Sequence, residues 1–127
     1  MAENNDASDA DSKWPGVSVT DGNKYCILFL KVHNMKVKKK HGLFGVLVPC
    51  NADINVKFSK REVIVNVTVR DDDDNATVYE YKKSLPEEID EVHSKWQIFK
   101  EDRIKIELCK AKSGSWERHV KILQKRE

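Results

Sequence analysis

Apolar and polar residues alternate with a period of two in four separate segments of this sequence. In the clearest of them, 63–69, every second residue is valine, and Ile64, Asn66 and Thr68 lie between the valines. Successive side chains of a β-strand point to opposite faces, so this period predicts strands that each bury one face. Strands of this kind are typical of antiparallel sheets. The four segments are 54–58, 63–69, 77–82 and 104–109.

Short polar breaks separate these segments and favour hairpins. Residues 59–61, 71–75 and 100–102 are the three candidates. The second of them contains four consecutive aspartates, whose mutual repulsion is best tolerated in a solvated loop. Residues 84–88 resemble the start of a helix, but we expect a crossover loop with at most one helical turn, because Trp96 follows closely. Short strands at this spacing predict an all-β sandwich or barrel.

The segment 24–33 differs from the others because its predicted strand is apolar on both faces. Such a strand must be covered twice. The second cover is either another part of this chain or a partner. The two faces carry Cys26, Leu28, Leu30 and Val32 on one side and Tyr25, Ile27 and Phe29 on the other.

The segment 35–52 begins basic and becomes apolar. Its apolar part, 42–48, is predicted either to add an edge strand or to fold over Tyr25, Ile27 and Phe29, and the sequence leaves both courses open. Its basic part, Lys36 to Lys40, is the best candidate for contact with nucleic acid or another acidic surface. Because few aromatic residues follow, no platform for stacking bases is visible, and we expect a solvated loop.

Composition indicates one globular domain. The chain has 127 residues, and its 23 Lys and Arg residues against 21 Asp and Glu residues leave a net charge of +2. That balance gives no global attraction to nucleic acid or membranes. No apolar run approaches the length of a membrane span. The three cysteines Cys26, Cys50 and Cys109 form no paired motif, so we expect a reducing compartment, the cytoplasm, with the nucleus as a second location.

Three parts are predicted along the chain. Residues 1–12 are polar and acidic, lack the apolar core of a signal peptide, and are expected to form a disordered arm. Residues 13–120 are expected to form the sandwich, with 35–52 as a long insertion. Residues 121–127 are expected to form a basic tail.

No pattern for catalysis or cofactor binding is present. The spacings of His33, His41 and Cys50 match no usual zinc motif, so we expect no metal. No strained serine turn and no glycine-rich phosphate loop occurs, so we expect neither an enzyme nor a cofactor. Cys26 and Cys109 lie in predicted strands and are expected to be small packed side chains. Trp96 and Trp116 flank the last two predicted strands, and we expect both to pack in the core.

The order of several motifs resembles the CS domain family, which includes cochaperones of the ninety-kilodalton heat-shock protein. The segment 102–116 resembles the family's closing motif: a basic residue, an alternating I-x-I-x-L strand, lysines, a small-residue turn and Trp116. Residues 86–90 and 94–98 resemble the family's crossover and next strand. Residues 55–59 and 63–67 resemble its second and third strands, and Thr20-Asp21 resembles a short "TD" signature.

The resemblance implies an immunoglobulin-like, two-sheet antiparallel β-sandwich of about seven strands, similar to α-crystallin and CS domains. It also implies docking to the heat-shock protein through an aromatic late in the first strand and a basic residue opening the last strand. Those positions match Phe29 and Arg103. We therefore expect a partner-binding face made by Tyr25, Ile27, Phe29, Lys31, Arg103 and Lys105.

Two departures from the family pattern bear on this expectation. The segment 35–52 is longer than the usual connection, so it can cover the partner face, and the aromatic residue that usually precedes the signature is replaced near Ser18. From the resemblance we still expect a monomeric co-chaperone. Several alternatives stay open. The domain can belong to a larger protein and recruit another client or contact an enzyme domain. It can bind an acidic surface through Lys36 to Lys40, or act as a holdase-type chaperone.

Overall fold

The computed structural model of the chain describes residues 12–39, 46–100 and 102–126. Nine strands and two short helices occur in these residues. The strands are β1 (Gly16–Asp21), β2 (Tyr25–Lys31), β3 (Val37–Lys39), β4 (Leu47–Pro49), β5 (Ala52–Ser59), β6 (Glu62–Arg70), β7 (Ala76–Ser84), β8 (Lys95–Lys100) and β9 (Arg103–Cys109), and the helices are the 3₁₀ turn η1 (Glu117–His119) and α2 (Val120–Gln124).

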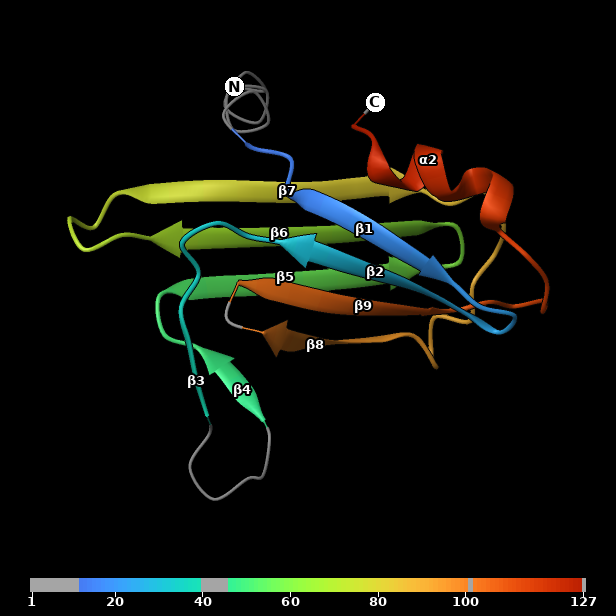
Figure 1. Cartoon of the computed structure of the whole chain (residues 1–127), viewed down its shortest axis with the longest axis horizontal. Helices are drawn as coiled ribbons and strands as arrows, with labels where there is room; N and C mark the ends of the chain where they lie inside the picture. Colours follow the sequence, from blue (N-terminus) through green and yellow to red (C-terminus); the bar gives the residue numbers. More distant parts are fainter. Residues whose placement is uncertain (1–11, 40–45, 101, 127) are drawn as a thin grey trace.

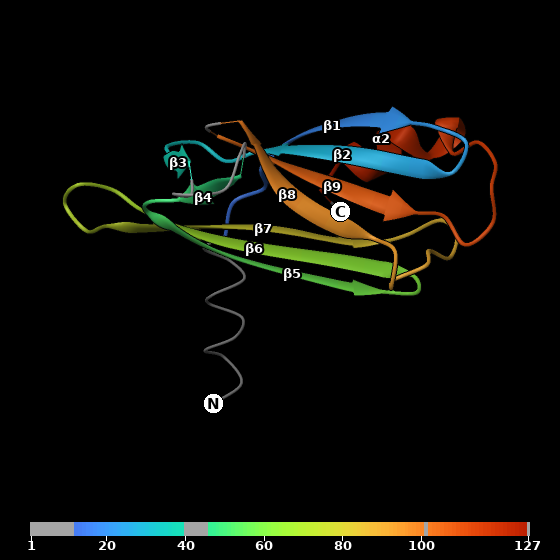
Figure 2. The ribbon, with the colours of Figure 1, turned by 90° about the horizontal axis from the view of Figure 1, so that it is seen from below.

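Two antiparallel sheets face each other and form a β-sandwich. One sheet has the strand order β1-β2-β9-β8 and the other has the order β5-β6-β7, so the two layers contain seven strands (Figure 1). Figure 2 shows the layers from the side, with β8 and β5 along the same edge of the sandwich. The prediction of an all-β sandwich is therefore confirmed. The two further strands, β3 and β4, form a small sheet of their own.

The predicted hairpins are present. Ser59 pairs with Glu62 across the first turn, and Lys100 pairs with Arg103 across the third. In the acidic turn, Asp71 Oδ1 accepts hydrogen bonds from the backbone N–H groups of Asp73 and Asn75. This side-chain-to-backbone pattern is the reason that aspartate suits such turns. Between β7 and β8 the chain forms a loop with one turn, as the sequence predicts.

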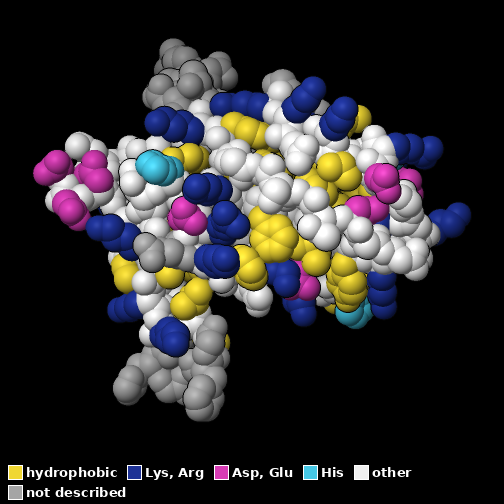
Figure 3. Space-filling view, in the orientation of Figure 1, with side chains coloured by type: hydrophobic (Ala, Val, Ile, Leu, Met, Phe, Trp, Pro, Cys, Tyr) yellow, Lys and Arg dark blue, Asp and Glu magenta, His cyan; other side chains and the backbone are white. Residues whose placement is uncertain are grey.

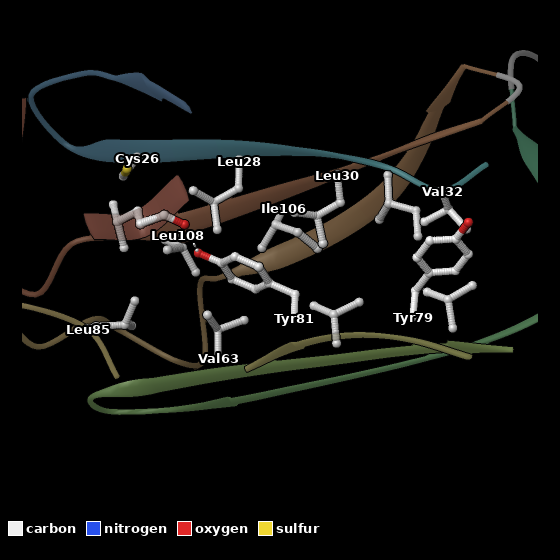
Figure 4. Packing of buried hydrophobic residues seen from close by; sticks show 14 of the residues in the cluster. Cys26, Leu28, Leu30, Val32, Val63, Tyr79, Tyr81, Leu85, Ile106 and Leu108 are labelled. Atoms are coloured by element: carbon white, nitrogen blue, oxygen red, sulfur yellow. Dashed lines mark hydrogen bonds between the residues drawn. The ribbon is translucent and has the colours of Figure 1, made fainter. Parts of the chain in front are cut away.

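The core lies between the two sheets, and period-two alternation explains its composition. The inward residues of β2 and β9 pack against those of β6 and β7 (Figure 4). The alternate residues of each strand point away from the core. Cys26 and Cys109 are buried free thiols, which confirms them as packed side chains. The central buried residues are Cys26, Leu28, Leu30, Val63, Val65, Val67, Val69, Tyr79, Tyr81, Ile104, Ile106 and Leu108.

The C-terminal segment packs against the sandwich, which corrects the prediction of a tail over 121–127. Helix α2 contacts β1, and its Leu123 side chain is fully buried in the core. The backbone carbonyls at its end accept hydrogen bonds from side chains elsewhere. Tyr81 Oη donates to Leu123, Trp14 Nε1 to Gln124 and Lys83 Nζ to Lys125, over 2.8 to 3.0 Å. These bonds satisfy carbonyls that a helix end leaves unpaired.

A buried ion pair joins β1 to the chain after β9. The Lys110 side chain is fully buried, with Nζ 2.7 Å from Asp21 Oδ1 and 5.3 Å from the centre of the Trp116 ring. The ammonium also donates to the carbonyls of Gly22 and Gly114. Asp21 Oδ2 accepts the backbone N–H of Trp116 at 2.7 Å. Trp116 is buried, as predicted, and this cluster fixes its position.

The insertion at 35–52 takes neither of the two courses considered from the sequence, as far as its described residues go. Strands β3 and β4 pair with each other, and β4 approaches β8 without joining its sheet. The Asn51 side chain holds the base of this hairpin. Its Nδ2 donates to the carbonyls of Asn34 and Arg70, and its Oδ1 accepts the backbone N–H of Lys36. Residues 40–45 lie outside the described part of the chain.

Strand β1 is an element that the sequence patterns did not predict. It pairs with β2 along its whole length, from Gly16 opposite Lys31 to Asp21 opposite Cys26. The expected N-terminal arm falls almost entirely outside the described residues, which begin at Ser12. In the described part of the chain, no helix has the length and apolar character needed to cross a membrane.

Candidate protein-docking face

The outer face of the sheet β1-β2-β9-β8 carries the predicted partner-binding residues. In β2 the inward residues are fully buried, whereas Tyr25, Ile27 and Phe29 point the other way and are half-buried. In β9 the same alternation points Arg103 and Lys105 outward, because Ile104 and its inward neighbours fill the core. All six predicted residues therefore lie on one face.

Three of the six residues line one pocket. Phe29, Lys31 and Arg103 surround a hollow of about 220 Å³ together with Gly16 and Ser18 of β1. The register of the sheet explains this grouping, since Lys31 pairs with Arg103 across β2 and β9, and Ser18 pairs with Phe29 across β1 and β2. The pocket combines an aromatic wall with two cationic groups. This combination suits an apolar side chain that is flanked by a carboxylate.

The other three residues extend the face without lining that pocket. Lys105 is the cross-strand partner of Phe29. Ile27 lies between Thr20 and Glu107, and Tyr25 lies beyond it, where the face becomes less cationic. Figure 3 shows hydrophobic side chains in the middle of this face and Lys and Arg side chains gathered toward one end.

The cations near Phe29 are weakly neutralised. Lys31 Nζ lies 4.0 Å from Asp102 Oδ2, and both side chains are solvent-accessible, so this pair contributes little. Arg103 and Lys105 form no ion pair among the described residues. Weakly neutralised cations beside an aromatic ring give this end of the face a positive potential.

Phe99 belongs to the face, although the sequence patterns did not single it out. Its ring meets the Phe29 ring edge to face, with centroids 5.1 Å apart. Lys100 lies above the Phe99 ring, with Nζ 5.5 Å from its centre. The alternation of β8 indicates this position, because Ile98 points into the core and its neighbour must point outward. Gly16 and Ser18 were missed for a different reason, since β1 was not recognised as a strand.

Trp96 does not pack in the core as predicted. Its side chain is 37% exposed and lines a second hollow, between β8 and β4. The tryptophan follows the alternation of β8 toward the core side, but β8 is an edge strand, so the ring reaches the rim of the sandwich. The sequence shows the alternation but not that β8 lies at the edge.

The titratable side chains of the described residues bear on metal binding and on thiol reactivity. No group of three or more His, Cys, Asp or Glu side chains in 12–39, 46–100 and 102–126 is placed to hold a metal ion. Burial, with the nearby Asp21 charge, raises the pKa of the Cys26 thiol from 9.0 to about 12, so this thiol stays protonated and unreactive at neutral pH.

No protein-family model matches the chain, and no curated protein matches it.

Proposed function

We propose that this chain is a non-enzymatic docking domain that acts as a co-chaperone and binds the ninety-kilodalton heat-shock protein. The observation that carries the proposal is the pocket in which Phe29, Lys31 and Arg103 meet on an outward sheet face. An aromatic residue and arginine are the residue types that most often dominate binding energy at protein interfaces. Arginine also binds a carboxylate through two parallel hydrogen bonds.

The mechanism is stoichiometric binding. The apolar residues of the face lose contact with water when the partner covers them, and Lys31, Arg103 and Lys105 select a surface rich in carboxylates. The resemblance to CS domains supports the choice of partner, because the matching positions in that family belong to the docking face.

Calorimetric titration of the purified chain into the full-length heat-shock protein tests the proposal, with and without nucleotide and at two salt concentrations. We expect saturable binding that weakens at higher salt. Lys31→Glu and Arg103→Glu should each weaken binding at least tenfold, about 1.4 kcal/mol. Lys57→Glu is the matched control, because Lys57 is an exposed lysine on the outer side of the other sheet.

Two outcomes contradict the proposal. Equal weakening by Lys31→Glu and Lys57→Glu would show that net charge, and not this face, controls binding. No binding of the wild-type chain at high concentration would exclude the heat-shock protein as the partner. Circular dichroism of each variant keeps loss of binding separate from loss of fold.

A further inference from the structure

The outer face of the sheet β1-β2-β9-β8 carries an exposed pair of aromatic rings. Phe29 in β2 and Phe99 in β8 meet edge to face, with ring centroids 5.1 Å apart. Strand β9 lies between β2 and β8 in the sheet, so the two rings meet across it. The Phe99 side chain is 40% exposed, and the Phe29 side chain is half-buried. Rings placed in this way on an open sheet face can stack with other planar groups.

Two further outward residues of β2 extend this pair into an apolar track. Tyr25, Ile27 and Phe29 alternate with fully buried residues, so they follow one another on the outer face. Outward neighbours in a strand lie about 6.6 Å apart. The far end of the track is again aromatic, and Lys24 Nζ lies 6.0 Å from the centre of the Tyr25 ring. More than one planar group can therefore lie along β2.

Four cationic side chains lie around the ring pair. Two of them line the pocket that contains Phe29, one is the cross-strand partner of Phe29, and one lies over the Phe99 ring. Among these four, and within the described residues, only Lys31 has an ion pair, a weak one with Asp102. A second carboxylate, that of Glu107, lies one row further along β9. The four cations are, in this order, Lys31 and Arg103, Lys105, and Lys100.

Rings and cations in this arrangement fit single-stranded nucleic acid. Its bases can stack on exposed rings, and its phosphates pair with clustered Lys and Arg side chains. Ser18 and Gln97 lie in the same cross-strand row as Phe29 and Lys105, and their polar groups can bond the edges of bases. A duplex fits less well, because its bases are already stacked inside the helix and a broad sheet face does not enter a groove.

Only the fold assembles this platform. Few aromatic residues follow the basic segment Lys36 to Lys40 in the sequence, and its described lysines Lys38 and Lys39 lie in β3, which belongs to a different sheet. The rings and cations of the platform come from β2, β8 and β9, which strand pairing brings side by side. The site therefore differs from the basic segment that the sequence points to.

We infer that the outer face of β2, β9 and β8 binds single-stranded nucleic acid, with bases stacked on Phe29 and Phe99 and phosphates against the four cations. It is the same face that is proposed to dock the heat-shock protein, so the two ligands exclude each other. The inference depends on the rings and charges of the face and not on the identity of the protein that docks there.

The test uses a fluorescein-labelled oligothymidine of about ten nucleotides, titrated with the full chain by fluorescence anisotropy. The comparison probe is an abasic oligonucleotide of the same length, which has the same phosphates and no bases. We expect saturable binding of the oligothymidine, at least tenfold tighter than that of the abasic probe. With about four phosphate contacts, its affinity should fall roughly fiftyfold when the salt concentration is raised about fourfold. Absence of binding, or equal binding of both probes, would overturn the inference.

Variants separate stacking from charge. Phe29→Leu combined with Phe99→Leu removes both rings and keeps apolar side chains, so it should weaken oligothymidine binding at least tenfold and leave binding of the abasic probe unchanged. Lys105→Glu should weaken binding of both probes, roughly fivefold or more. Lys57→Glu, an exposed change on the outer side of the other sheet, is the matched control and should alter neither. Thermal unfolding of each variant keeps loss of binding separate from loss of fold.

Three further outcomes decide. Amide chemical-shift changes should cluster in the outward residues of β2, β8 and β9, and changes confined to β3 and β4 would overturn the site. Where both ligands bind, the oligothymidine should displace the heat-shock protein, and a complex of all three would overturn the shared face. Failure of the heat-shock protein to bind, with the oligothymidine bound as expected, would refute the proposed function and leave this inference standing.

Discussion

The Lys110 ammonium is shielded from solvent, and three kinds of group compensate its charge. Asp21 supplies a carboxylate, two backbone carbonyls accept hydrogen bonds, and the Trp116 ring lies 5.3 Å away. Among the described residues, Asp21 Oδ1 has no well-aligned hydrogen bond, so it relies on the ion pair alone. The aspartate, lysine and tryptophan of the sequence resemblance thus form one structural cluster, away from the docking face.

Replacement of Lys110 by methionine should destabilise the fold by about 3–5 kcal/mol, because it leaves the mostly buried Asp21 carboxylate without its counter-ion. Urea unfolding monitored by circular dichroism measures the change. Lys112→Met is the matched control, since Lys112 is exposed on the same segment, and it should change stability by less than about 0.5 kcal/mol. A similar loss in both variants would contradict the role of the buried pair.

The three cysteines should react with a thiol reagent at very different rates. Cys50 is exposed, whereas Cys26 and Cys109 are buried. Burial also holds the Cys26 thiol in its protonated form, because its pKa is raised to about 12. Ellman's reagent should therefore label one thiol in the native protein and three after denaturation. Rapid native labelling that persists in Cys50→Ser would show that the core opens readily.

Helix α2 is one of the elements that the sequence patterns did not predict, because its stability comes from tertiary contacts and not from its own sequence. Five residues are too few for a stable isolated helix. The segment forms because Leu123 enters the core and because Tyr81, Trp14 and Lys83 bind its final carbonyls. Those partners are 42 to 110 residues distant in the sequence, so no local pattern reveals them.

Adjacent residues of α2 should respond differently to truncation. Leu123→Ala removes a fully buried side chain and should cost about 2–5 kcal/mol. Ile122→Ala removes a side chain that is 51% exposed and should change stability much less. Thermal and urea unfolding of the two variants measure the difference. Equal losses would mean that α2 does not pack as described.

The strands show where the sequence is informative. The alternation in 63–69 and 104–109 predicts both the strands and their inward faces, because burial of one face imposes period two. The same reasoning finds Phe29, which is apolar on the outward face of β2. It fails for β1, whose only large apolar residues are Val17 and Val19. It also fails for Trp96, because alternation cannot distinguish an edge strand from a central one.

The whole molecule should be most stable between weakly acidic and weakly alkaline pH. Burial raises the pKa values of Cys26, from 9.0 to about 12, and of Tyr81. As pH rises, these two groups therefore lose their protons in the unfolded chain before they do so in the folded one. The free energy of unfolding falls as pH rises above 9. Hydrogen bonds from His93 lower the pKa of Asp90 below 3.8, so its contribution is lost as pH falls through that range.

Urea unfolding across the pH range measures this profile. In Cys26→Ala the free energy of unfolding should fall less steeply between pH 9 and 12, because one group with a raised pKa is removed. This change in slope is expected whatever the overall stability of the variant. His93→Ala should raise the pKa of Asp90, which carbon-detected NMR titration reports directly. If the free energy of unfolding of Cys26→Ala falls with pH as steeply as that of the wild type, the thiol does not contribute to the alkaline loss of stability.

Asymmetry is the main property of the sandwich as a whole. Its β1–β7 side is closed by α2, and its β8–β5 side carries the hollow between β8 and β4 (Figures 1 and 2). The side that is closed holds the fold together through long-range hydrogen bonds. The β8–β5 side leaves Trp96 and Phe99 exposed beside β4.

The closed side also brings the two ends of the described chain together. Arg126 donates hydrogen bonds to the carbonyl and the hydroxyl of Ser12. A short linker can therefore join these two residues and make the backbone circular. New termini can then be opened within the exposed acidic turn at 71–74. Such a circular permutant would keep every strand pairing and would move its ends to the tip of the β6–β7 hairpin, a convenient place for tethering or labelling the domain.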